Sequence, residues 1–362
     1  MSEVQVGGAV PAPEEPAASG KAAPRWRGWL FALVKLGLAA ALLAWILRKP
    51  EFEWGRIGRA LLSPSLLPIL LLASLGLSCS GVRWLLLLRG EGIKVGLLTA
   101  IKLTWIGHFW NMVIPGAVSG DAVKMYYIGQ VAPEQREEAW TTVFADRAVG
   151  LAALVAVAAI ASLAQFEVMW AQPRMRVLLV VMVSSLVAFG VGMVVVGSGI
   201  GRGWAIVERA AGMLPQGLRE LLRRAYGSLH RTCRRPGILL ATFAISFFAH
   251  GTAVTNTFLL GRSLGEQDLS FARYSSVVPV ALVANTIPLT PGGGVGVGES
   301  VIGQLFEWSG GSAGKGAMVM LSYRVVFFSL AAVGAALYAF YRHQDPRLKG
   351  LGTQAPSPAP EP

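Results

Sequence analysis

Two acidic residues and two arginines recur in matched positions in the two halves of the sequence. Asp121 and Glu299 each follow a stretch rich in proline and glycine, and Arg147 and Arg324 come later, at separations that agree to within one residue. A guanidinium group binds phosphate through two parallel hydrogen bonds and keeps its charge at any physiological pH. The spacing therefore predicts an anion-binding site to which each half of the chain contributes one arginine.

Two other interpretations of these residues stay open. Asp121 and Glu299 begin predicted short helices, where a carboxylate caps free backbone amides and complements the helix dipole. The arginines can also form internal ion pairs, Arg147 with Asp121 or Asp146 and Arg324 with Glu299, because buried charges are usually paired. Either arrangement uses the same residues without a ligand.

Further ionisable residues fall inside apolar segments. Lys124, Lys102 and Arg83 are expected near the cytoplasmic interface, where long basic side chains extend their charged ends into water. Lys124 and Asp146 are nonetheless included in the predicted site for an anionic lipid head group, which then consists of Arg147, Arg324, Asp121, Glu299, Asp146 and Lys124. His108 and His250 are isolated in the sequence, and a histidine hydrogen-bonded within a helix is expected rather than a proton relay.

The composition excludes most classes of soluble protein. Of 362 residues, 54% are hydrophobic and 14% are charged, whereas a soluble domain carries about 25% charged residues. Lysine and arginine outnumber aspartate and glutamate by 32 to 20, giving a net charge of +12. In so apolar a chain this excess indicates the cytoplasmic loops of a membrane protein, and no nucleic-acid partner is expected.

Six segments reach the roughly 20 apolar residues that a membrane-spanning helix needs. They are 28–47, 66–88, 138–165, 176–196, 237–260 and 316–341. The first follows basic residues as a signal peptide does, but its length and its basic end favour an uncleaved membrane helix. The flanking segments 1–24 and 343–362 have the composition of disordered tails, which leaves 25–342 as the transmembrane domain.

Two weaker apolar segments, 97–113 and 271–289, run into turns that cannot continue a helix. The loop 197–236 carries eight arginines against two glutamates, so the positive-inside rule places it and both termini in the cytoplasm. The alternation of crossings then requires both weaker segments to be re-entrant hairpins. Their predicted turn residues are Asn111, Pro115, Gly116 and Gly120 in the first, and Asn285, Pro288, Pro291, Gly292, Gly293, Gly294, Gly296 and Gly298 in the second.

Each hairpin is framed by two spanning helices, so the pattern predicts repeat one at about 66–165 and repeat two at about 237–341. The repeats enter the membrane from opposite faces, and inverted repeats of broken helices are a common plan among transporters. The predicted fold is therefore all-α, a polytopic membrane protein with about six spanning helices and two re-entrant hairpins in inverted repeats.

The segments 111–121, 145–151, 287–299 and 322–324 resemble the lysylphosphatidylglycerol synthase transmembrane region, also called the flippase-like family. The resemblance runs over about 30–342, and the glycine-rich run 292–298 departs from the family pattern. It implies a plasma-membrane protein, and in multidomain members a region that moves a modified lipid between leaflets while a separate soluble domain makes that lipid. Because few residues follow the last predicted helix, the synthase activity is not expected here.

These features together predict a lipid translocase that moves an anionic or polyprenyl-linked lipid between leaflets of the plasma (inner) membrane. The alternative is a membrane-embedded enzyme or an accessory subunit of lipid-linked glycan synthesis. We find no nucleophile–base set, metal-ligand spacing or phosphate-binding loop, so no catalytic residue, metal or cofactor is predicted, and the chain is expected not to be an enzyme. The partners considered are membrane lipids and lipid-modifying or glycosyltransferase enzymes.

Overall fold

The computed structural model describes residues 52–114, 119–198, 216–286 and 295–344, with isolated residues at 44, 48, 208 and 212. Over these ranges the chain is helical and forms no β-strand, which confirms the predicted all-α class. The first predicted span, 28–47, lies almost entirely outside the described residues, as do the segments 1–24 and 345–362.

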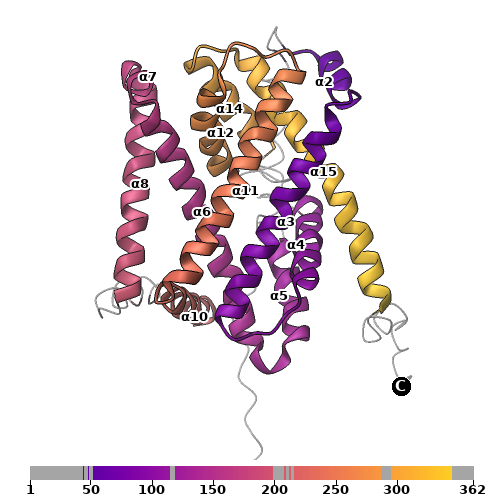
Figure 1. Cartoon of the computed structure of the whole chain (residues 1–362), viewed down its shortest axis with the longest axis vertical. Coiled ribbons are helices and arrows are strands. Elements are labelled where there is room, and N and C mark those ends of the chain that lie inside the picture. Colours follow the sequence, from indigo (N-terminus) through magenta and orange to yellow (C-terminus); the bar gives the residue numbers. More distant parts are fainter. Residues whose placement is uncertain are drawn as a thin grey trace, which may run out of the picture.

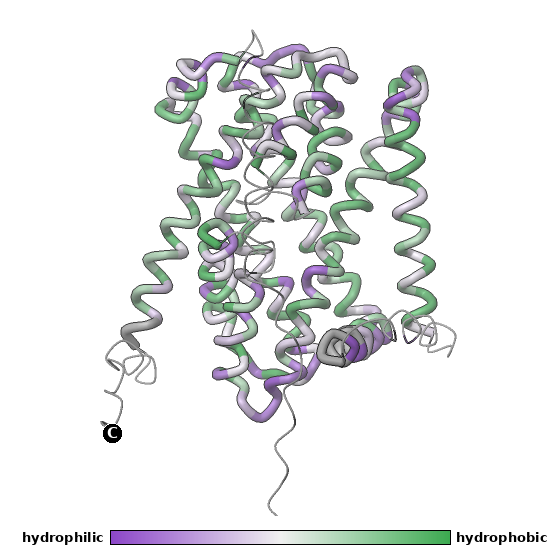
Figure 2. The backbone as a smooth tube through the Cα atoms, turned by 180° about the vertical axis from the view of Figure 1, so that it is seen from behind, coloured by the Kyte–Doolittle hydropathy of each residue, from purple (hydrophilic) through white to green (hydrophobic). Residues whose placement is uncertain are grey.

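Five of the described helices are long and apolar enough to cross a membrane. They are α3 (Leu66–Gly90), α6 (Arg136–Ala164), α8 (Pro173–Ser198), α11 (Pro236–Ser263) and α15 (Ala313–Gln344). Their apolar residues extend along most of the length of the bundle, and hydrophilic residues gather toward its two ends (Figure 2). The protein is therefore a polytopic membrane protein, and these helices match five of the six predicted spans.

Two pairs of shorter helices follow α3 and α11 in the sequence. They are α4 (Leu97–Val113), α5 (Ser119–Val131), α12 (Phe271–Asn285) and α14 (Val297–Trp308). At 1.5 Å per residue each is shorter than the ~30 Å hydrocarbon core of a bilayer. In Figure 1, α4 and α5 occupy the lower half of the bundle, whereas α12 and α14 occupy its upper half.

The helices form two units of matching order, which we call unit one (α3, α4, α5, α6) and unit two (α11, α12, α14, α15). Unit one begins at the top of the view in Figure 1 and unit two begins at the bottom. Helix α3 packs along α11, while α4 packs on α15 and α12 packs on α6. Each unit thus places its first short helix against the last long helix of the other.

Close approach of α3 to α11 depends on a small residue. A Cβ atom at Gly76 would lie 2.5 Å from the Oγ1 atom of Thr252, which is inside van der Waals contact. A similar approach occurs where Gly334 of α15 faces the backbone carbonyl of Trp105 on α4. Glycine at these points removes the side chain that would otherwise collide with the facing helix, so the two units can approach closely.

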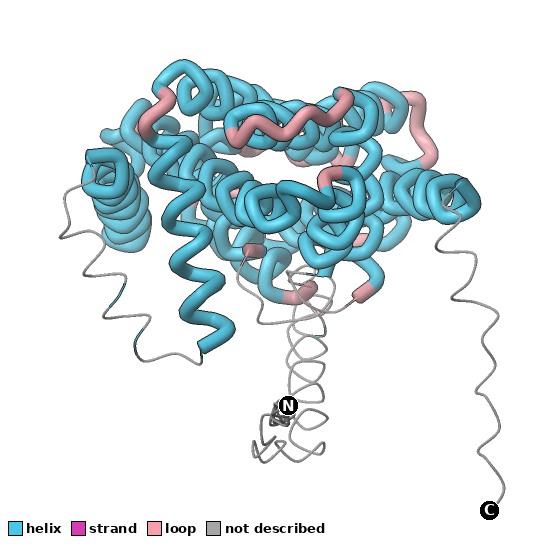
Figure 3. Tube along the Cα trace, turned by 90° about the horizontal axis from the view of Figure 1, so that it is seen from below, coloured by secondary structure: helices cyan, strands magenta, loops and turns pink. Residues whose placement is uncertain are grey.

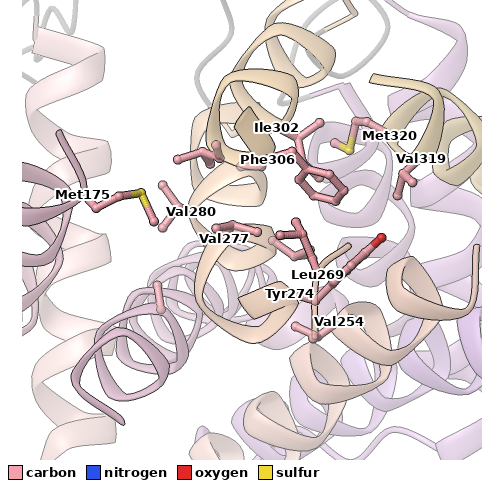
Figure 4. Packing of buried hydrophobic residues seen from close by; sticks show 14 of the residues in the cluster. Met175, Val254, Leu269, Tyr274, Val277, Val280, Ile302, Phe306, Val319 and Met320 are labelled. Carbon is pink, nitrogen blue, oxygen red and sulfur yellow. The ribbon is translucent and has the colours of Figure 1, made fainter. Parts of the chain in front are cut away.

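The largest apolar cluster packs the short helices of unit two against their neighbours (Figure 4). Tyr274 of α12 and Phe306 of α14 meet edge to face, with ring centroids 5.1 Å apart. Met175 extends the cluster to α8, and Met320 extends it to α15. Such packing fixes the angle of α12 and α14 relative to the long helices, and therefore the position of every polar group that they carry.

Helix α10 (Gln216–Cys233) lies across the lower ends of the long helices rather than along them (Figures 1 and 3). It occupies the second half of the basic segment predicted as a loop at 197–236, most of whose first half is outside the described residues. Arg231 of α10 binds Glu91 at the end of α3 with an Nε–Oε2 distance of 2.6 Å. Two smaller helices, α2 (Trp54–Leu61) and α7 (Phe166–Ala171), lie at the opposite end of the bundle (Figure 1).

The contact between α4 and α5 provides a test of this packing. A Cβ atom at Gly120 would collide with the backbone carbonyl of Gly107, which cannot rotate away as a side chain would. We expect Gly120→Ala to lower the midpoint of thermal unfolding in detergent. The matched control is Gly192→Ala in α8, where no atom lies within 4 Å of the added methyl, and where alanine favours the helix by ~1 kcal/mol. Equal midpoints for Gly120→Ala and the wild type would contradict the close packing.

Candidate functional site

The first predicted acid–arginine pair forms inside unit one. Asp121, in the first turn of α5, accepts hydrogen bonds from Arg147 of α6, with distances of 2.7 Å to Nε and 3.1 Å to Nη2. The carboxylate is largely buried, whereas 51% of the Arg147 side chain is exposed. The Arg147 guanidinium therefore forms a bidentate contact with the carboxylate of Asp121, while part of the arginine side chain remains accessible to solvent.

The carboxylate of Asp146 joins two buried cations from different helices. Its Oδ1 lies 2.7 Å from Nε of Arg83 on α3, and its Oδ2 lies 3.5 Å from Nζ of Lys124 on α5. Arg83 also donates to Ser246 of α11 at 3.2 Å. Both cations are buried, so neither extends its charged end into water as was expected. Asp146 supplies a partner inside the bundle that offsets the cost of burying them.

An aromatic ring completes the surroundings of Lys124. The Nζ atom lies 4.2 Å from the centre of the Trp84 ring, a position in which the ring face attracts a cation. The Trp84 indole N–H in turn donates to Thr142 at 3.0 Å, which fixes the orientation of the ring. Lys102, by contrast, is exposed on α4.

The second predicted pair forms inside unit two. Arg324 of α15 donates from Nε to Glu299 in a very short contact and from Nη2 to Asn285 at 3.3 Å. Glu299 also accepts from the backbone N–H of Gly296 at 2.8 Å, which caps the start of α14. Gly296 has a φ of +85°, a conformation that favours glycine. Glu299 therefore both caps the start of α14 and forms an ion pair with Arg324.

The predicted turn residues lie partly within the described structure. Asn111 accepts from the backbone N–H of Gly120 at 2.8 Å, so its side chain satisfies a group at the start of α5. Gly298 packs against the side chain of Asn285, the corresponding contact in unit two. Outside the described residues lie Pro115, Gly116, Pro288, Pro291, Gly292, Gly293 and Gly294.

His108 and His250 are each hydrogen-bonded to a backbone carbonyl of another helix. His108 of α4 uses Nε2 to contact Phe327 of α15 at 3.0 Å, and His250 of α11 uses Nε2 to contact Gly150 of α6 at 3.0 Å. Both contacts connect helices of different units. Within the described residues no group of three or more histidine, cysteine, aspartate or glutamate side chains is placed to hold a metal ion.

The unit-one charges line a cavity of about 180 Å³, which we call cavity one. Its charged lining residues are Arg83, Lys124, Arg147, Asp121 and Asp146. Three cations face two carboxylates, so the lining has an excess of one positive charge. In unit two the single cation of the Arg324–Glu299 pair is balanced by a single carboxylate. Each unit thus has an acid–arginine ion pair, but the charged residues around cavity one have an excess positive charge that the Arg324–Glu299 pair lacks.

Arg83 is a member of this site that the predicted head-group-binding set did not include. The signal for it was present, since an arginine interrupts the apolar span 66–88 well before its end. What the sequence did not provide was the partner, because Asp146 lies on α6, which α4 and α5 separate from α3 in the chain. The predicted head-group-binding set was Asp121, Asp146, Lys124, Arg147, Glu299 and Arg324, with one arginine from each half of the chain. The first four line cavity one, whereas Glu299 and Arg324 pair with each other inside unit two and are not among its lining residues.

Comparison with known proteins assigns these features to a family. The sequence model of the lysylphosphatidylglycerol synthase TM region matches residues 32–334, which is most of the chain. The chain belongs to this family. A UPF0104 membrane protein of Methanothermobacter thermautotrophicus is 24% identical over 275 residues, covering 72% of this chain and 80% of that protein. Another from Pyrococcus horikoshii is 25% identical over 267 residues, covering 68% of this chain and 78% of that protein.

Membership of the family corrects one prediction and refines another. The family is named for a lipid-modifying synthase, which contradicts the expectation that the chain is not an enzyme; the matched model describes the transmembrane region. Together with the five apolar helices, the match identifies an integral membrane protein of lipid metabolism or transport.

The balanced pair in unit two makes a prediction about stability. We expect Glu299→Gln to destabilise the fold by ~3–5 kcal/mol, because it leaves the buried Arg324 guanidinium without its carboxylate. The double variant Glu299→Gln with Arg324→Gln removes both charges and is expected to recover part of that loss. Thermal unfolding of the purified variants measures both effects. A double variant that is less stable than either single variant would show that the ion pair is not what the two residues contribute.

Proposed function

We propose that the protein moves a lipid with an anionic, phosphate-containing head group between the leaflets of the membrane. The single observation that carries this proposal is the excess positive charge of cavity one, whose cations Arg83 and Lys124 are buried inside the bundle. A buried excess charge is costly, and a bound phosphodiester with one negative charge would neutralise it. A cavity of about 180 Å³ has room for such a group.

The arrangement of the two units supports a transporter mechanism. The short helices α4 and α5 are proposed to form one re-entrant hairpin, and α12 and α14 to form the other. Their opposite placement in the bundle, with the antiparallel course of the two units (Figure 1), supports inverted repeats. Because the units meet along α3 and α11 through small residues, rocking of one against the other can expose cavity one to each side in turn.

A second candidate is favoured by the family name. A membrane-embedded enzyme, or an accessory subunit of lipid-linked glycan synthesis, would place chemistry rather than passage at cavity one. Its candidate acids, Asp121, Asp146 and Glu299, are each engaged by a cation. Mass analysis of the lipid recovered after incubation separates the two functions, because translocation leaves the lipid unchanged and a modifying enzyme changes its mass.

The charge of cavity one makes a prediction about transport. We expect Lys124→Gln to reduce leaflet exchange of an anionic phospholipid about tenfold in liposomes that contain the purified protein, because it removes the excess charge. Asp146 keeps its contact with Arg83 in this variant, so the fold is expected to remain. Lys102→Gln is the matched control, since it removes a lysine from the exposed side of α4. If Lys124→Gln and Lys102→Gln reduce the rate of leaflet exchange equally, or if neither reduces it, a head-group site at cavity one is contradicted.

Topology is a second part of the proposal. We propose a plasma-membrane location with α10 and both termini in the cytoplasm, because α10 carries four arginines against one glutamate. In a variant whose Cys79 and Cys233 are replaced by alanine, new cysteines are introduced singly at the exposed positions Glu307 and Arg235. An impermeant maleimide applied to intact cells is expected to label the first position directly and the second only after permeabilisation. Labelling of both from one side would reject the proposed orientation.

A further inference from the structure

Only one of the charges around cavity one can be removed at neutral pH. The titratable and charged groups of its described lining come from α3, α4, α5 and α6, and they are Arg83, His108, Asp121, Lys124, Asp146 and Arg147. A guanidinium cannot be deprotonated in a protein. Protonation of a carboxylate or of the histidine would add to the positive excess rather than remove it. Among these groups, Lys124 is therefore the one whose loss of a proton makes the empty cavity neutral.

The surroundings of Lys124 balance its charge only in part. The residue is 6% exposed. Oδ2 of Asp146 lies 3.5 Å from its Nζ atom, but the other oxygen of the same carboxylate is held at 2.7 Å by Arg83. One carboxylate thus serves two cations, and the Trp84 ring adds a weaker attraction. An amine in such a place loses its proton more readily than one in water, because burial disfavours the charged form.

Water in cavity one can exchange protons with Lys124. A volume of about 180 Å³ bordered by charged and hydroxyl-bearing side chains is large and polar enough for several water molecules, each of which occupies about 30 Å³ in the liquid. Lys124 lines this space, so its ammonium group can give a proton to water there and recover one from it. The charges of Arg83 and Arg147 cannot change in this way. Cavity one thus combines fixed positive charge with one charge that is adjustable.

Resting on the proposed function, we propose that Lys124 binds a proton that crosses the membrane with each anionic lipid. While a phosphodiester occupies cavity one, its negative charge balances the excess and Lys124 is protonated. When the phosphodiester leaves, the ammonium group gives its proton to water in the cavity and remains as the neutral amine. The loaded and the empty cavity are then both neutral, so neither state moves an uncompensated charge through the bundle. A pH gradient therefore drives the lipid toward the alkaline side.

Proton uptake on binding tests this site without transport. Short-chain phosphatidylmethanol is titrated calorimetrically into the purified full chain in detergent, in two buffers of different ionisation enthalpy, which gives the number of protons taken up per lipid bound. Across a pH series the maximum is expected to approach one proton, and where it does the affinity falls about tenfold for each unit rise in pH. Phosphatidylcholine is the matched ligand, because its quaternary ammonium already balances its phosphodiester and binding requires no proton.

Two variants of Lys124 identify the proton site. Lys124→Arg keeps the positive charge but cannot release a proton, so it is expected to bind phosphatidylmethanol at all pH values without proton uptake. Lys124→Gln has neither the charge nor the proton, and it provides the same test of uptake if the larger arginine disturbs the fold. Lys102→Gln is the matched control on the exposed side of α4 and is expected to retain uptake. Uptake that persists in both Lys124 variants, or that is lost in His108→Gln instead, would overturn the proposal.

Leaflet exchange in liposomes separates failure of this inference from failure of the proposed function. With the membrane potential held at zero, a gradient of one pH unit is expected to enrich phosphatidylmethanol about tenfold in the leaflet that faces the alkaline side. Liposomes with Lys124→Arg are expected to show no such enrichment. Proton uptake without leaflet exchange would support the proton site and reject translocation. Exchange that is equal in both directions across the gradient, or binding without uptake, would overturn the proton coupling and leave translocation standing.

Discussion

An ionised side chain inside a membrane-spanning bundle is stable only beside a partner of opposite charge, and this requirement determines how the helices of this protein meet. Asp121 holds the start of α5 against α6, and Glu299 holds the start of α14 against α15. Asp146 gathers α3 and α5 around α6 through two cations. The ion pairs therefore set the geometry of the short helices, and the apolar packing in Figure 4 completes it.

Pairing alone does not make the two units equivalent. Both repeat the same local plan, with an asparagine at the end of one short helix, a glycine and an acid at the start of the next, and an arginine on the long helix that follows. Unit one adds Arg83, Lys124 and Asp146 to this plan. The acid–arginine pair that both units share is electrically neutral and stabilises the fold. The added part gives one unit the unbalanced charge on which the proposed head-group site depends.

The sequence by itself determined the all-α class and five of the described spans, because apolar length is a local property. It also predicted one set of Asp121, Asp146, Lys124, Arg147, Glu299 and Arg324, of which the first four line cavity one in the structure. It also determined that α4 and α12 end at turns. Only the tertiary structure decided that Asp146 pairs with Arg83 rather than with the adjacent Arg147, since that choice depends on where α3 crosses α6.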